Sequence, residues 1–94
     1  MAKIRRVVLD VLKPHDPKMI PFTEELNDNE DVLGVTAKLV ALDENVRTLR
    51  VTIEGEDLDF ESIEARIADL GGSIHSVDEV SVGKEIVEDA WIAN

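Results

Sequence analysis

The chain has 94 residues, 44% of them hydrophobic and only 3% aromatic, and its 21 acidic against 10 basic residues give a formal net charge of −11. Without cysteine, it has no disulfides, thiolate zinc sites or thiol nucleophiles. Acidity disfavours nucleic acid, and no segment reaches the ~20 apolar residues of a membrane span. We therefore expect one cytoplasmic domain over residues 1–94, with neither nucleic-acid nor membrane partners and a tail at 83–94.

A strand is predicted over about residues 3–13, where apolar residues occupy both alternating positions. The loop 14–17 ends it, and Asp16 followed by Pro17 is typical of a helix N-cap and first helical position. Pro21 is expected to remove a backbone hydrogen bond and bend this helix. Helical spacing predicts one buried stripe of side chains: Met19, Phe22 and Leu26.

The remaining elements repeat this order. Strands are predicted over 35–42 and, after a polar turn, over about 48–54, where Leu49, Val51 and Ile53 alternate with polar residues. A second helix capped by Asp59 should bury Phe60, Ile63, Ile67 and Leu70 and end at the glycine pair 71–72. A last strand over 74–82 precedes a tail in which helix-like spacing suggests a third, short helix.

The order βαββαβ predicts an α+β fold, the ferredoxin-like sandwich, in which two helices cover one face of a four-stranded antiparallel sheet. The other face is expected to expose apolar residues of the first, second and fourth strands. Because monomers seldom expose a large apolar patch, we expect the tail, another copy of the chain, or both to cover it. The interface residues predicted on this basis are Val8, Leu12, Val40, Leu42 and Trp91.

Three segments resemble a family of small archaeal proteins known as domain-of-unknown-function family 211. They are IRRVVLDVLKPHDP at 4–17, TIEG at 52–55 with Asp59 and Phe60, and LGGSIHSVDEV at 70–80. The resemblance covers the chain apart from about its last eight residues. It implies a ferredoxin-like fold, an archaeal cytoplasmic setting and a tendency to assemble, but no activity.

Both histidines are predicted to lie at one edge of the sheet, because the end of the first strand meets the start of the fourth in this topology. With one carboxylate they form a candidate site for Zn²⁺ or a similar divalent ion: His15, Asp16 and His75. The alternative is that the carboxylate caps the helix while both imidazoles bind loop backbone.

The opposite edge is predicted to collect carboxylates from two loops, 28–31 and 54–59. They are Asp28, Glu30, Asp31, Glu54, Glu56, Asp57 and Asp59. Ca²⁺ or Mg²⁺ would suit such oxygen ligands, although no EF-hand spacing is present. The alternative is a solvated acidic rim that keeps the protein soluble.

Charges inside two strands need partners or solvent. A carboxylate at Asp10 is expected to form an ion pair, with Arg50 of the neighbouring strand or with Arg5 or Arg6 of another subunit. The pair 78–79 breaks the alternation of the fourth strand and indicates a bulge or a charged edge.

The sequence holds no nucleophile elbow, phosphate loop or dinucleotide fingerprint. We therefore expect a non-enzymatic, homo-oligomeric module that binds a divalent metal ion or a small metabolite. A purely structural or protein-interaction domain is the alternative. A hydrolase or isomerase using His15 and Asp16 is the third possibility.

Overall fold

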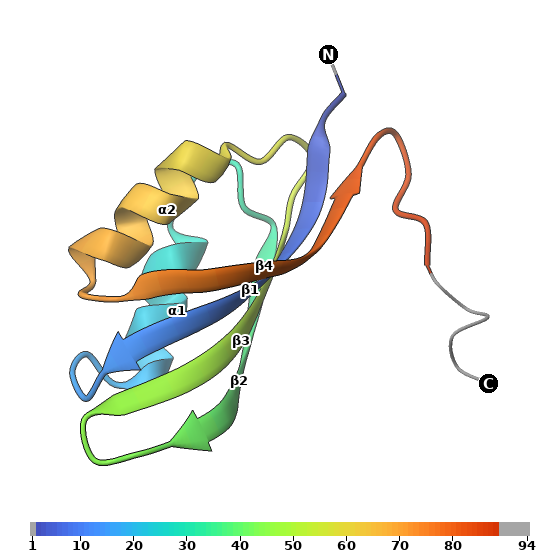
Figure 1. Ribbon diagram of the computed structural model, residues 1–94. Helices are drawn as coiled ribbons and strands as arrows, with labels where there is room; N and C mark the ends of the chain where they lie inside the picture. The colour runs from blue at the N-terminus through green and yellow to red at the C-terminus, as the bar shows by residue number, and fades with distance from the viewer. Residues whose placement is uncertain (1, 89–94) are drawn as a thin grey trace, which may run out of the picture.

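The computed structural model describes residues 2–88 as a four-stranded antiparallel sheet with two helices on one face (Figure 1). The strand order is β2-β3-β1-β4, so β1 and β3 are central. This confirms the predicted ferredoxin-like α+β sandwich. The elements in chain order are β1 (Ile4–Pro14), α1 (Met19–Asn27), β2 (Gly34–Leu42), β3 (Val46–Glu54), α2 (Phe60–Asp69) and β4 (Ser73–Val82).

The core lies between the central strands and the helices. Alternate residues of β1 and β3 point to the helices and are buried: Val7, Leu9, Val11, Leu49, Val51 and Ile53. The helices meet them with the predicted stripes, of which Phe22, Leu26, Ile63 and Ile67 are buried. Met19, Phe60 and Leu70 pack against this core and remain partly exposed.

Helix α2 begins and ends where its sequence predicts. The carboxylate of Asp59 accepts a hydrogen bond from the backbone N–H of Ser62 at 3.3 Å. At the other end Gly71 adopts φ +86°, and the N–H groups of Gly71 and Gly72 each donate at 2.9 Å, to the carbonyls of Ala68 and Ile67. This is a Schellman motif, which requires a left-handed residue that glycine adopts without strain.

Helix α1 begins later than predicted. Its N-cap is Lys18, which makes no side-chain cap, so the prediction that Asp16 caps the helix is wrong. Pro21 is consequently the third helical residue, where a backbone N–H has no acceptor within the helix. It therefore removes no hydrogen bond, contrary to the sequence-based expectation.

The C-terminal segment leaves β4 without forming a helix over residues 83–88. The Arg5 guanidinium holds its start by donating to the carbonyls of Gly83, at 3.5 Å, and Lys84, and also to that of Gly55, at 3.1 Å. The rest of the predicted third helix, with Trp91, lies outside the described residues. Within residues 2–88 neither helix is long and apolar enough to cross a membrane.

Candidate interface on the open face of the sheet

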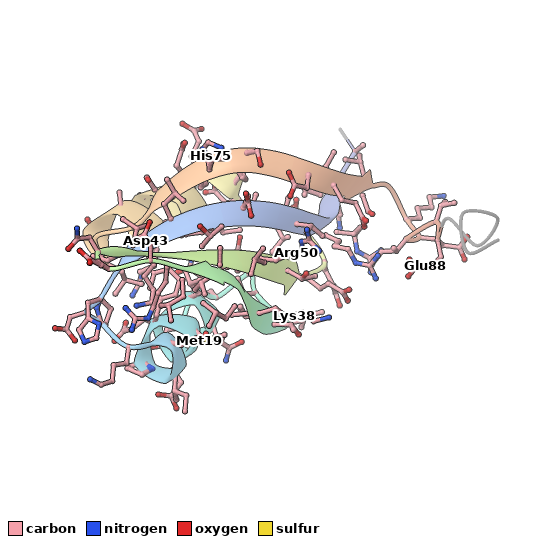
Figure 2. All side chains as sticks on the ribbon, turned by 60° about the horizontal axis from the view of Figure 1, so that its bottom comes forward. Met19, Lys38, Asp43, Arg50, His75 and Glu88 are labelled. Carbon is pink, nitrogen blue, oxygen red and sulfur yellow. The ribbon has the colours of Figure 1, made fainter. Side chains whose placement is uncertain are left out.

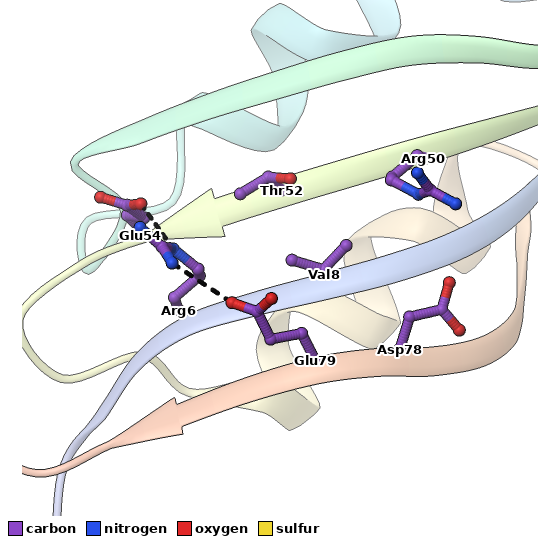
Figure 3. A pocket seen from close by; sticks show the side chains of 7 residues that line it. All are labelled: Arg6, Val8, Arg50, Thr52, Glu54, Asp78 and Glu79. Atoms are coloured by element: carbon purple, nitrogen blue, oxygen red, sulfur yellow. Dashed lines mark hydrogen bonds and ion pairs between the residues drawn. The ribbon is translucent and has the colours of Figure 1, made fainter. Parts of the chain in front are cut away.

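The open face is the side of the sheet turned away from α1 and α2, and it is polar rather than apolar. The strand register assigns these side chains to it: Arg6, Val8, Asp10, Leu12, Thr36, Lys38, Thr48, Arg50, Thr52, Glu54, Ser76, Glu79 and Ser81. Asp78 lies beside them (Figure 3). The expectation of apolar residues on this face is therefore correct for Val8 and Leu12 of β1, whereas β2 and β4 contribute mainly polar side chains to it. One reason is that register shifts in β4 place Val77 opposite Leu9 and Val80 opposite Val7, on the helix-covered side.

Cross-strand partners arrange this face in rows that run across all four strands. The three rows, each from β2 through β3 and β1 to β4, are Gly34-Glu54-Arg6-Ser81, Thr36-Thr52-Val8-Glu79 and Lys38-Arg50-Asp10-Ser76. In the third row the cations lie on the β2 and β3 half and the carboxylate on the β1 half. In the first row the order is reversed, with the carboxylate of Glu54 on β3 and the cation of Arg6 on β1.

Arg6 anchors one end of the face. Its guanidinium contacts Glu54 at 2.7 Å, Glu79 at 3.2 Å and Glu88 at 3.0 Å. The hydrogen bond to Glu88, followed by those to Glu54 and Glu79, raises the pKa of Arg6, and Arg6 lowers the pKa of the Glu88 carboxyl. Because one cation serves three carboxylates, this end of the face keeps a surplus of negative charge.

The middle of the face carries charges without partners. Within residues 2–88, Lys38, Arg50, Asp10 and Asp78 form no ion pair closer than 4.0 Å. Asp10 and Arg50 are cross-strand partners, so the predicted neighbour is correct, but the predicted ion pair within the chain is not made. Asp78 accepts a hydrogen bond from the Ser76 hydroxyl at 2.7 Å.

A shallow hollow of about 430 Å³ lies among these groups. Figure 3 shows the Arg50 guanidinium and the Asp78 carboxylate on opposite sides of β1, with no interaction drawn between them. Lys38 and Arg50 also face each other across β2 and β3, which is an unfavourable pairing of like charges. The face therefore presents separated positive and negative groups to its surroundings.

The predicted histidine site is only partly assembled. Leu12 pairs with Ser73, so the end of β1 does meet the start of β4. However, the Nδ1 atom of His15 lies 2.8 Å from an Arg47 guanidinium nitrogen, and His75 occupies a register shift in β4. Across residues 2–88 no group of three or more His, Asp or Glu side chains is placed to hold a metal ion. Zinc binding by His15, Asp16 and His75 stays a prediction.

The acidic edge comes together more fully. A cavity of about 450 Å³ is lined by Asp28, Asn29, Glu30, Asp31, Asp57, Asp59, Ser62 and Arg66. Asp31 already accepts the Asp59 backbone N–H at 2.5 Å, which links the two loops. Of the predicted set, Glu54 lies on the open face and Glu56 lines a different cavity beside Arg5.

Sequence reasoning missed Lys13, which is fully buried in the core. Its ammonium donates to the carbonyls of Pro14 at 2.8 Å, His15 at 3.4 Å and Pro17, and lies 5.9 Å from the centre of the Phe22 ring. Burial lowers the pKa of Lys13. Its odd-numbered position, in phase with the buried Leu9 and Val11, was the available signal. The lysine holds together the loop that precedes α1.

Comparison with known proteins agrees with the resemblance seen in the sequence and extends it towards the C-terminus. Residues 5–93 match the family model described as uncharacterized ArCR, domain-of-unknown-function family 211. The chain is also 45% identical over 89 residues to an uncharacterized protein of Methanocaldococcus jannaschii, a match that covers 95% of this chain and 92% of that protein.

Proposed function

Because the chain belongs to domain-of-unknown-function family 211, its surfaces are the basis for a functional assignment. We propose that it is a non-enzymatic module that works as a homo-oligomer. The proposal rests on surface groups that a small monomer would leave unsatisfied.

The observation that carries the proposal is the apolar character of both sheet edges. Large apolar side chains of the edge strands have half or more of their surface accessible: Leu39, Val40 and Leu42 on β2, and Val77, Val80 and Val82 on β4. Unpaired edge strands also present free backbone hydrogen-bonding groups. A second copy of the chain would cover both kinds of group at once. The predicted interface residues Val40 and Leu42 lie on one of these edges.

The mass in solution tests this proposal. We expect light scattering and native mass spectrometry to give a multiple of the 10.4 kDa chain mass. Replacing Leu39 or Val77 by lysine should lower the assembled fraction, whereas Ile20→Lys, at an exposed apolar residue of α1, should not. A mass equal to one chain at every concentration would reject the proposal.

Divalent cation binding is a second candidate function, favoured by the convergence of two loops on the acidic cavity. Carboxylates such as Asp28, Glu30 and Asp57 offer the oxygen ligands that Ca²⁺ and Mg²⁺ prefer, but no three acidic side chains of residues 2–88 are already placed around one ion position, so binding would require the loops to draw them together. Asp31 and Asp59 already accept backbone hydrogen bonds, so a bound ion would share these carboxylates with the loop and with the α2 cap. The open cavity favours exchange with solvent and modest affinity.

Thermal melts with added Ca²⁺, Mg²⁺ or Zn²⁺ test this second function. Binding should raise the melting temperature, because an ion that binds the folded state stabilises it by mass action. Asp57→Asn should reduce the increase, and Asp69→Asn, outside the cavity, should leave it unchanged. Native mass spectrometry of protein purified without chelator would also reveal a retained metabolite. Melting unmoved by every ion would remove this candidate.

A further inference from the structure

We propose that the open face docks onto the open face of a second copy through a two-fold axis parallel to the strands, so that Arg50 of each copy pairs with Asp10 of the other. This inference rests on the proposed self-assembly and adds to the apolar sheet edges a second contact surface, with its symmetry and charge pairing. The occupant of the face is a second copy because the face is complementary to itself.

The symmetry follows from the strand order. An axis in the plane between two stacked sheets, running along the strands midway between β3 and β1, keeps each row at its own level. It places β3 of one copy over β1 of the other, and β2 over β4. Each side chain of β2 or β3 therefore faces the β4 or β1 side chain of the same row in the other copy.

The charges of the third row match under this rotation. Arg50 faces Asp10 of the second copy, and Lys38 faces Ser76 with the neighbouring Asp78. In the first row Glu54 faces Arg6, but these two already pair within each chain, and in the second row Glu79 faces the neutral Thr36. The unpaired charges of the third row thus acquire partners across the interface.

The other in-plane axis, perpendicular to the strands, keeps each strand over itself and reverses the order of the rows. Placed through the middle row, it brings Arg50 to Glu54 and Asp10 to Arg6, but Glu54 and Arg6 already pair within each chain, and Glu79 then faces Glu79. The axis parallel to the strands instead joins Arg50 to Asp10, which form no ion pair within residues 2–88, so electrostatics favour it.

The middle of the face is accessible for such docking. Lys38, Arg50 and Asp78 are exposed. In Figure 2, Glu88 lies beyond the end of the sheet opposite the Asp43 turn, so the described part of the tail leaves the Arg50 row uncovered. Four strands about 4.8 Å apart and about nine residues long give roughly 570 Å² for each copy, or roughly 1,100 Å² in total, just above what a specific interface needs.

Complementary charge reversals test the pairing. Arg50→Glu places a carboxylate opposite Asp10 twice in its own dimer, and Asp10→Arg places two arginines together at the same two contacts. Each variant alone should therefore associate at least about tenfold more weakly than the original chain. An equimolar mixture should associate again, because the contacts between the two variants no longer bring like charges together. Native mass spectrometry with one variant isotope-labelled identifies the mixed species.

Lys18→Glu is the control, since it reverses an exposed charge in the loop before α1, away from the open face. Circular dichroism melts confirm that each variant folds. If the original chain assembles but the mixed variants do not recover association, the face-to-face geometry is overturned while the proposed homo-oligomer stands. If the original chain is a monomer, the proposed function fails, and this inference with it.

Discussion

The helix-covered and open faces of the sheet are made by alternate residues of the same strands, yet their side chains find partners in different ways. On β1, Leu9 and Val11 are fully buried by the helices, whereas Asp10 between them lies on the open face without an ion pair in residues 2–88. On the central strands β1 and β3 the covered face is thus complete within one chain. The open face carries groups whose natural partners are other charges.

The difference shows which part of the molecule sets stability and which part sets association. Burial of apolar area is additive and needs no precise partner, so the covered face can close within 94 residues. Charges on the open face remain solvated until an opposite charge displaces the water, and each such pair contributes specificity more than stability.

The largest expected effect is on the covered face. Leu9→Ala should lower the free energy of unfolding by about 2–5 kcal/mol, because it opens a cavity in a fully packed site. Val8→Ala, at the next residue but on the open face, should cost less than about 1 kcal/mol. Urea unfolding at one low protein concentration measures both. Equal losses would contradict the assignment of the two faces.

A smaller effect is expected from the buried lysine. Lys13→Met removes the donor shared by the carbonyls of Pro14, His15 and Pro17, and should destabilise the protein by about 1–3 kcal/mol. Lys38→Met makes the same chemical change on the open face and should alter stability by less than about 0.5 kcal/mol. Denaturant unfolding followed by circular dichroism compares them. A lysine that could be replaced without loss would show that the loop does not depend on it.

Salt concentration should affect association through the open face and stability of the covered face differently. Raising the ionic strength from about 0.1 M to about 1 M shortens the screening length from ~10 Å to ~3 Å. Association through Arg50 and Asp10 should weaken severalfold, while the apolar core is not weakened. Sedimentation velocity measures the first quantity and thermal melting of Arg50→Glu the second. Association that strengthens with salt would indicate the apolar sheet edges instead.

The smallest expected effect is the pH dependence of the tail contact. Arg6 lowers the pKa of Glu88 below its usual 4.5, so the contact is fully present above that value and is lost as pH falls through the lowered pKa. Carbon NMR of the Glu88 carboxyl group should therefore show a midpoint below 4.5 that returns towards 4.5 in Arg6→Gln. A midpoint that does not move would show that Arg6 does not hold the segment.

Local patterns were sufficient for much of the fold. The stripes of α1 and α2, the Asp59 cap and the glycine that ends α2 were predictable because their partners lie within a few residues. The convergence of two acidic loops was also predictable, since the topology brings both to one edge. The start of α1 was not predictable from local pattern, because it depends on the loop that Lys13 holds together.

The sequence by itself therefore determined the order of elements, the fold and the covered face, all of which follow from periodicity and short-range capping. Only the tertiary structure decided which side chains lie on the open face and where its charges are. Single-residue register shifts in β4 place Val77 and Val80 on the helix-covered side. Arg6 likewise gathers carboxylates from distant strands and the tail. Such contacts join residues far apart in the chain, so they exist only once the strands have paired.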